Sequence, residues 1–556
     1  MRIKPRFFFP VLFIIYSLLI LSGLAANLLP DPVWKVTVDK DVEWQKFSPN
    51  DNLIVGTKEN LICLDKDSGQ PLWTVDNLSD IHSDYFSFIP GTPYAIAEQL
   101  IIVEERDERT SALTRHGHCI LNLLDYESGR VIWTSRDLGL FSCQGNFLVR
   151  SLKALMAYGR DEQDNDIMQL VDLATGNILW RNENFFDEEK PETFSMIVTD
   201  GTEKVINGNQ VPLFDTEETI ITYMSRKYVR RWNVGTGELL WKSEIYPFKP
   251  PVLVEGYMPM ALSPDREIVY VPCRNYLFAL RTIDGTKLWE EPVKLRGIPR
   301  HVEFVDNGML VWGESDNKGK NGKPFIILLD PRSGQPLWEK PFNKLKDGLT
   351  TNFIIRDNSL LIYSDKKIYS VDINDGSYAE FARDLKFDGK ESPAYMKRTD
   401  DGYFLVSSQN LMLVNGQGQK VFHTYCKAPG VSGLLKFATI VSSLAGYTLG
   451  YYMVAGALPT YAPVNYRFPR FKATVISDNY VYMLTETKPT LEELGKKEQY
   501  GHNKNFSKPA LVKINKQTGA IVSTLFLQDK TPIYDIDNTE SKVYYARDKE
   551  ICCYDF

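Results

Sequence analysis

The 556-residue sequence predicts an all-β fold, a single closed β-propeller of four-stranded antiparallel blades. Three observations predict it. A short phrase returns along most of the chain, its copies are spaced by about one blade, and the two chain ends resemble two parts of one blade. An N-terminal apolar segment and an apolar insertion, both expected to be helical, accompany the propeller.

The repeated phrase reads apolar-Asp-x-x-(Ser/Thr)-Gly-x-x-apolar-Trp, and the letters SGQPLW are identical in two of its copies. Six copies place Gly and Trp four residues apart: 64–73, 124–133, 171–180, 232–241, 280–289 and 329–338. Three weaker copies follow at 371–380, 414–422 and 514–523. A phrase repeated in this way indicates one structural unit made many times.

Each part of the phrase has a physical interpretation. The residues before it alternate between apolar and polar, which is typical of a strand. Asp accepts hydrogen bonds from backbone amides ahead of it, and Gly supplies the positive φ of a tight turn. The Trp begins the next antiparallel strand and is expected to wedge between neighbouring sheets. The phrase therefore predicts one hairpin of each blade.

The spacing of the repeats predicts ten blades. Successive glycines lie 60, 47, 61, 48, 49, 42 and 42 residues apart, and then 101 apart across an insertion. The C-terminal residues 541–556 match the strands before a turn, and residues 31–38 match the strand after it, with Trp34 in the repeated position. Nine turns and this shared blade make ten, or eight if two weak units are not blades. The propeller is expected over 31–425 and 466–556, closing with residues 31–40.

Composition excludes some classes of function. A net charge of −7 and scattered Lys and Arg residues argue against nucleic-acid binding. The seven cysteines contain no C-x-x-C pair, so a structural zinc site is not expected. Their odd number and wide spacing favour free, buried strand cysteines.

The N-terminal segment 1–30 predicts export. Arg2, Lys4 and Arg6 precede residues 7–29, which carry no charge. Such a run can span a hydrocarbon core of about 30 Å as a helix. The preceding positive charges favour a cytoplasmic N-terminus, which leaves the propeller on the periplasmic or extracytoplasmic side. An uncleaved anchor is favoured over a cleavable signal peptide, and both export the chain.

The repeat resembles that of the quinoprotein dehydrogenase-like propellers, known as PQQ-like repeats, over nearly all of residues 31–556. This resemblance implies the propeller fold, whereas the family includes both quinone-dependent dehydrogenases and non-enzymatic scaffolds such as the outer-membrane-assembly propeller. A dehydrogenase resemblance would imply a calcium ion, a catalytic Asp and a vicinal disulfide over the cofactor. Cys552 and Cys553 are adjacent, but Cys553 aligns with Cys63 in a strand, which favours two core residues.

The sequence shows no catalytic constellation, cofactor site or metal site. The repeated acids lie in equivalent turns on different blades: Asp65, Asp125, Asp172, Asp330 and Asp372. The Trp series is interpreted as blade packing rather than a sugar-binding platform. His116 and His118 lie near Cys119, but three potential ligands without a fourth favour surface histidines. Motifs of serine hydrolases, zinc proteases and nucleotide-binding proteins are missing.

The insertion 426–465 interrupts the repeat. Residues 433–458 contain one charged side chain, Lys436. A single membrane crossing would separate 466–556 from the ring, so a short apolar hairpin is expected, dipping into the membrane or docking on a partner; packing onto the propeller is the alternative. The expected contact residues are Leu434, Leu435, Phe437, Ile440, Leu444, Tyr447, Leu449, Tyr451, Tyr452, Met453 and Leu458.

Together these observations predict a non-catalytic, membrane-tethered propeller scaffold that mediates protein–protein interaction in an envelope complex. Its expected partners are other envelope or membrane proteins, and the membrane itself through residues 7–29 and 433–458. The alternative is a quinone-dependent or sugar-acting periplasmic oxidoreductase. A ligand-binding sensor domain without protein partners is a third possibility.

Overall fold

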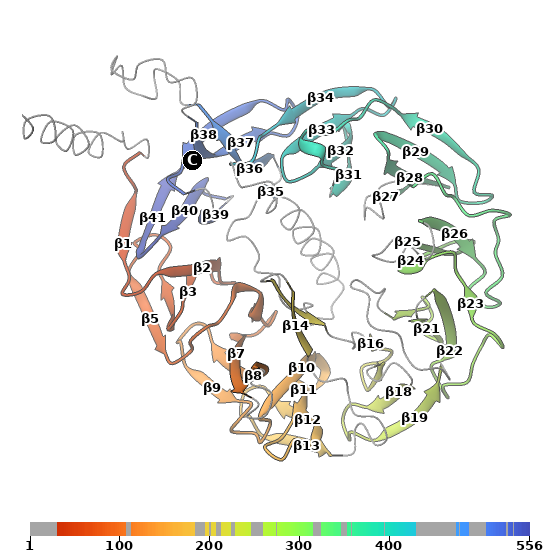
Figure 1. The fold of residues 1–556 in the computed structure, drawn as a ribbon, viewed down its shortest axis with the longest axis horizontal. Coiled ribbons are helices and arrows are strands. Elements are labelled where there is room, and N and C mark those ends of the chain that lie inside the picture. The colour runs from red at the N-terminus through yellow and green to blue at the C-terminus, as the bar shows by residue number, and fades with distance from the viewer. Residues whose placement is uncertain are drawn as a thin grey trace, which may run out of the picture.

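The protein forms a ring of ten blades in a computed structural model (Figure 1). The structure describes residues 30–556, without 107–112, 184–194, 200–201, 207–212, 224–227, 246–259, 274, 315–323, 346–352, 357, 394, 430–473, 477–478, 489–506, 530–531 and 538. Within these residues, nine blades have four antiparallel strands and one has three. The predicted all-β propeller is confirmed, with ten blades rather than eight. Residues 1–29 lie outside the described part.

Blades are numbered along the chain, and their strands run from the ring centre outward. Blade 1 contains β2 (Val42–Phe47), β3 (Leu53–Thr57), β4 (Asn60–Leu64) and β5 (Pro71–Asp76). Blade 2 contains β6 (Phe86–Phe88), β7 (Tyr94–Arg106), β8 (Leu113–Asp125) and β9 (Val131–Thr134). Blade 3 contains β10 (Ser142–Val149), β11 (Ala154–Arg160), β12 (Asp166–Asp172) and β13 (Ile178–Asn182). Blade 4 contains β16 (Leu213–Phe214), β17 (Thr219–Thr222), β18 (Tyr228–Asn233) and β19 (Leu239–Glu244). Blade 5 contains β20 (Ala261–Leu262), β21 (Ile268–Cys273), β22 (Tyr276–Arg281) and β23 (Val293–Lys294).

The second half of the ring follows the same order. Blade 6 contains β24 (Ile298–Val305), β25 (Gly308–Glu314) and β26 (Phe325–Leu329). Blade 7 contains β27 (Phe353–Arg356), β28 (Ser359–Ser364), β29 (Lys367–Asp372) and β30 (Tyr378–Ala382). Blade 8 contains β31 (Tyr395–Thr399), β32 (Gly402–Val406), β33 (Asn410–Val414) and β34 (Lys420–Tyr425). Blade 9 contains β35 (Thr474–Ile476), β36 (Tyr480–Thr487), β37 (Lys508–Asn515) and β38 (Ile521–Phe526). Blade 10 contains β39 (Ile533–Asp537), β40 (Lys542–Arg547), β41 (Glu550–Asp555) and β1 (Trp34–Thr37).

A few elements lie outside the blades. The hairpin of β14 (Ser195–Thr199) and β15 (Thr202–Ile206) follows blade 3 and lies against β8. The described residues also form three short 3-10 helices, η1 (Ser83–Tyr85), η2 (Arg150–Leu152) and η3 (Asp388–Lys390). No helix among the described residues could cross a membrane.

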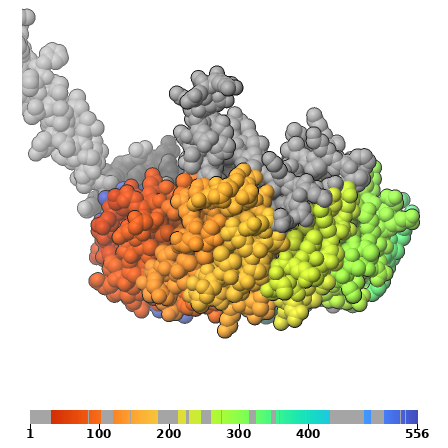
Figure 2. All heavy atoms as spheres, turned by 90° about the horizontal axis from the view of Figure 1, so that it is seen from below, coloured from red at the N-terminus to blue at the C-terminus, as the bar shows by residue number. Residues whose placement is uncertain are grey.

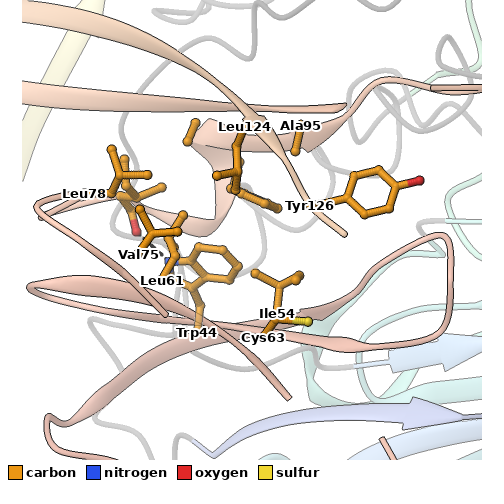
Figure 3. Packing of buried hydrophobic residues seen from close by; sticks show 12 residues of the cluster. Trp44, Ile54, Leu61, Cys63, Val75, Leu78, Ala95, Leu124 and Tyr126 are labelled. Atoms are coloured by element: carbon orange, nitrogen blue, oxygen red, sulfur yellow. Dashed lines mark hydrogen bonds between the residues drawn. The ribbon is translucent and has the colours of Figure 1, made fainter. Parts of the chain in front are cut away.

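Each pair of neighbouring blades shares one hydrophobic core. Between blades 1 and 2, Trp44 and Leu61 pack near Leu124 and Tyr126 (Figure 3). Equivalent clusters lie at the other nine joints, including the joint between blades 10 and 1. Seen from the side, the described blades form a flat disc (Figure 2). Because every joint is a core, burial is spread evenly around the ring.

The repeated Trp links each blade to the next. Trp73 of blade 1 donates a hydrogen bond from Nε1 to the backbone oxygen of Tyr126 in the turn of blade 2, at 3.1 Å. The same bond recurs from Trp34, Trp133, Trp180, Trp241, Trp289 and Trp338 to the turn of the next blade. The predicted wedge between sheets is confirmed, and the indole N–H adds a directional bond to it.

The turn glycine is needed because the indole lies against it. Gly376 has a φ of +74°, and a Cβ there would lie 2.8 Å from Cδ2 of Trp338 in the preceding blade. Phe422 takes the place of Trp against Gly519. The glycine therefore serves two purposes, a left-handed backbone and room for the neighbouring ring.

The two chain ends complete blade 10. β1 pairs with β41 in antiparallel register, with Trp34 opposite Cys553, which is the pairing that the sequence predicts. Lys66 in the turn of blade 1 pairs with Asp537 and Glu540 of blade 10, at 3.1 and 2.9 Å. The first and last parts of the chain are thus joined by backbone bonds, an indole bond and ion pairs.

Candidate partner-binding site at the base of the insertion

The predicted contact residues from Leu434 to Leu458 lie outside the described residues, so their contacts stay a prediction. The chain on either side of them is described. β34 ends at Tyr425, Cys426–Pro429 follow, and β35 begins at Thr474. We call Cys426–Pro429 and the residues that hold them the insertion base.

Backbone hydrogen bonds hold the insertion base on both sides. The amide of Cys426 donates to the backbone oxygen of Gln409 at 2.7 Å. The amide of Ala428 donates to the side-chain Oε1 of the same Gln409 at 3.1 Å. On the blade 9 side, the oxygen of Lys427 accepts from the amide of Glu486 at 2.7 Å and from Oγ1 of Thr485 at 3.0 Å. The base is therefore fixed to the β32–β33 turn and to β36.

Asn410 lies at the centre of this region and is fully buried. Its Oδ1 accepts from the amide of Asp388 and from Nε2 of His423, both at 2.9 Å. Because an amide oxygen only accepts, Nε2 of His423 carries the proton. The Asn410 Nδ2 donates to the backbone oxygen of Asp388 at 3.1 Å. One side chain thus joins η3, the β32–β33 turn and the outer strand β34.

Glu391 brings a charge into the same region, with 8% of its surface exposed. Its Oε2 accepts from Oγ of Ser407, from the amide of Gln409 at 3.1 Å and from Nδ2 of Asn410 at 2.9 Å. Its Oε1 is buried and has no hydrogen-bond partner among the described residues. Burial raises the pKa of this carboxyl, against the lowering effect of the three donors.

Three other titratable groups at the base, His423, Tyr425 and Cys426, are kept in their uncharged forms by burial. Burial lowers the pKa of His423, partly offset by Asp388. Burial raises the pKa of the Cys426 thiol to about 12 and also raises that of Tyr425, where Glu391 and Asp388 add to the effect. A protonated thiol is a poor nucleophile, and a neutral imidazole has no proton to give as an imidazolium acid.

Sequence reasoning missed Glu391 and Asn410, although a signal exists. The β32–β33 turn reads SSQN, and the β3–β4 turn of blade 1 reads TKEN. In both turns the first hydroxyl accepts from the amide of the Asn, from Asn60 to Thr57 at 3.0 Å and from Asn410 to Ser407 at 2.9 Å. The pattern identifies the turn. The contact with Glu391 could not be predicted from it, because Glu391 comes from another segment and reaches the turn only in the tertiary structure.

The other sequence-predicted groups are dispersed. The repeated acids bind their own turns, as where Oδ1 of Asp65 accepts from the amide of Ser68 at 2.8 Å. Cys552 and Cys553 are buried in different blade joints, and Cys553 faces Trp34 as Cys63 faces Trp73. All seven cysteines are free.

His116 and His118 lie on β8, but their side chains are outside the described part. The nearby Cys119 donates from Sγ to Oε2 of Glu98 at 3.7 Å. Among the described side chains, no group of three or more His, Cys, Asp or Glu residues is placed to hold a metal ion.

Several solved structures resemble this chain at low sequence identity. BamB from Moraxella catarrhalis is 11% identical, with 71% of this chain and 99% of that chain covered and a TM-score of 0.33. Dihydro-heme d1 dehydrogenase NirN in complex with DHE is 11% identical, with 70% of this chain and 77% of that chain covered and a TM-score of 0.35. The C-terminal WD40 domain of Sif2 is 8% identical, with 71% of this chain and 97% of that chain covered and a TM-score of 0.32. Similarity this low carries no argument about function.

The comparison with protein families is more specific. No curated protein matches the sequence. One family profile, described as outer membrane protein assembly factor BamB, matches residues 31–183 and 120–378, which together make up more than half of the chain. The chain therefore belongs to this family of PQQ-like repeat propellers.

Proposed function

We propose that the protein is a non-catalytic, membrane-tethered propeller scaffold that binds other proteins of a cell-envelope complex. Membership of the family described as an outer membrane protein assembly factor supports a role in protein interaction. The uncharged residues 7–29 support a tether, and their flanking charges support a propeller on the periplasmic or extracytoplasmic side.

The observation that carries the proposal is that the ring is complete on both sides of the insertion. Blades 8 and 9 share a core in which Phe404 and Leu411 pack with Val481 and Met483. This joint resembles the others, although residues 430–473 separate its two blades in sequence. The described residues alone form a core at this joint, so we propose that the apolar residues 433–458 make their contact with a partner.

The chemistry of the insertion specifies the kind of partner. Residues 433–458 offer many aliphatic and aromatic side chains with the single charge of Lys436. Aromatic and aliphatic anchors on a rigid frame suit an apolar groove on a partner protein. We propose contact residues Leu434 to Leu458, as predicted above, with an envelope or membrane protein as the partner.

The test compares three versions of the tagged protein extracted from native membranes in mild detergent. In one variant a Gly/Ser linker replaces 433–458, and in the matched control a Gly/Ser linker replaces the polar segment 495–505. The proposal expects stoichiometric partners with the wild type and the control, and their loss with the first variant. A wild-type protein recovered alone would contradict the proposal and direct attention to a bound quinone or sugar.

A further inference from the structure

We infer that Glu391 is a positioning residue for partner contact, because its buried carboxylate holds the turn that fixes the first residues of the insertion. This inference rests on the proposed function, since it concerns the way in which the insertion is presented. It adds a residue outside the insertion to the binding apparatus. Its evidence lies entirely in described residues.

The first observation is the burial of an incompletely bonded charge. Glu391 keeps 8% of its surface exposed, and no donor in the described part of the chain reaches its buried Oε1. Burying a carboxylate costs free energy that only full hydrogen bonding offsets. A neutral acceptor at this position would meet the same donors without that cost. The carboxylate is therefore a poor choice for stability alone, which calls for another explanation.

The second observation is a short chain of hydrogen bonds from Glu391 to the insertion. Oε2 of Glu391 accepts from the amide of Gln409. Gln409 in turn accepts from the amide of Cys426 through its backbone oxygen and from the amide of Ala428 through its side chain. A single residue thus lies between the buried charge and the insertion base. Charge-assisted bonds are the stronger kind, so the charge stiffens this link.

The third observation comes from equivalent turns in other blades. In blades 1 and 7 the chain leaving the outer strand also bonds to the turn, from Asp80 to Lys58 at 3.0 Å and from Leu385 to Lys366 at 2.9 Å. The blade 1 turn closes with Thr57 and Asn60 bonded to each other. A carboxylate is thus not needed to form such a turn. Blade 8, where the insertion leaves, adds Glu391 and the side chain of Gln409.

The consequence concerns the cost of binding. A segment whose base moves freely loses more conformational entropy when it docks, whereas a fixed base directs the segment before the encounter. Removing the carboxylate should release Gln409 and, through it, the amides of Cys426 and Ala428. Replacing it with an isosteric amide should preserve an acceptor but remove the charge, so the base should be held less firmly than in the wild type.

The experiment measures hydrogen exchange and partner retention in Glu391→Ala and Glu391→Gln, extracted in detergent as full chains. The control is Asn122→Ala, which removes a buried bond from Nδ2 to the oxygen of Ala97 at 3.1 Å in blade 2. In Glu391→Ala we expect amide exchange at Gln409, Cys426 and Ala428 to rise about tenfold. We also expect a several-fold loss of the retained partner. Glu391→Gln, which keeps an acceptor but loses the charge, should recover only part of both, and Asn122→Ala should change neither.

The outcomes separate this inference from the proposed function. Wild-type exchange and retention in Glu391→Ala would overturn the role of Glu391 and leave the scaffold function standing. Equal losses in Glu391→Ala and Asn122→Ala would also overturn it, because general destabilisation would then explain both. A wild-type protein that retains no partner would contradict the proposed function itself, whatever the exchange shows.

Discussion

The indole Nε1 of Trp34 donates a 2.8 Å hydrogen bond to the backbone oxygen of Lys66, across the joint where the ring closes. A Cβ at Gly69 would lie 2.5 Å from the same indole. Trp34 belongs to the last blade and Lys66 to the first. The bond between them is the same indole link that joins the other blades. Within the described propeller, it lies at the joint to which both ends of the chain contribute. Ring closure therefore uses the same chemistry as ring assembly.

Trp34→Ala should destabilise the protein by about 2–4 kcal/mol, because it removes a partly buried ring and its hydrogen bond. Trp34→Phe should cost less, about 1–2 kcal/mol, since most of the packing remains. Urea unfolding measures both changes in the free energy of unfolding. It is monitored by the circular dichroism of the backbone, because that signal does not rely on the substituted tryptophan. Val33→Ala, at a residue 50% exposed, is the control and should stay within about 0.5 kcal/mol.

Gly376→Ala should be more costly than Gly91→Ala, although both glycines have φ near +75°. At Gly91 a Cβ would meet no atom within 4 Å, so alanine there experiences only backbone strain of about 1–2 kcal/mol. At Gly376 the methyl group would also meet the Trp338 ring, adding about 1–3 kcal/mol. If both variants lost the same free energy of unfolding, the indole ring of Trp338 would move aside at no cost, and this would contradict the prediction.

Lys66→Met should destabilise ring closure by about 1–2 kcal/mol. Lys66 is 15% exposed and contacts both Asp537, 12% exposed, and Glu540, so solvent screens this network only partly. Lys35→Met is the matched control, because its pair with Glu550 leaves about half of each side chain exposed to solvent, so its removal should change the free energy of unfolding far less. Thermal unfolding at low and high salt distinguishes the two. A similar effect of both variants would argue against a buried closing network.

Glu98 should make stability fall with rising pH. Burial raises the pKa of its carboxyl from 4.5 to about 7, although Asn146 and Cys119 donate hydrogen bonds to it. Between these two values the folded protein holds a proton that the unfolded chain has lost, so stability declines through this window and is lowest above it. Glu98→Gln should therefore be more stable than wild type by about 1–2 kcal/mol at pH 8, and equal to it near pH 4.

Asp65→Asn should show the opposite pH dependence. Hydrogen bonds from Ser68 lower the pKa of Asp65, so its ionised form stabilises the turn above the usual pKa of an aspartate and the benefit disappears in acid. The variant should lose about 0.5–1 kcal/mol at pH 7 and nothing near pH 2. Unfolding curves across this range check both carboxyl groups in one series. Parallel curves for Glu98→Gln and Asp65→Asn would contradict both assignments.

The sequence predicts the blades well because each one is specified locally. Asp65 and Gly69 make the turn with their own neighbours, so the pattern needs no knowledge of the rest of the chain. The joint between first and last blades was also predictable, because Trp34 occupies the repeated position. The candidate site was harder to predict from the sequence. Glu391 acquires its role only when η3 meets the β32–β33 turn, and no local pattern encodes that meeting.

The identical letters SGQPLW show the division between local and tertiary control. At Ser68–Trp73 they lead into the full outer strand β5, but at Ser333–Trp338 the outer segment of blade 6 keeps isolated bridges, at Pro336 and Phe342. Pro341 follows the second copy at the third position after Trp, and it lacks the N–H that a ladder needs. The short β23 of blade 5 begins just after Pro292 in the same place.

By itself, the sequence determined the turn, the strand alternation, nine copies of the repeated phrase and the shared blade of the two chain ends, because these depend on residues a few positions apart or on one repeated residue. Only the tertiary structure decided that each indole meets the turn of the next blade, and that a buried carboxylate reaches the base of the insertion. Those contacts join segments whose sequences do not specify each other. Their geometry arises only when ten neighbouring cores close into a ring.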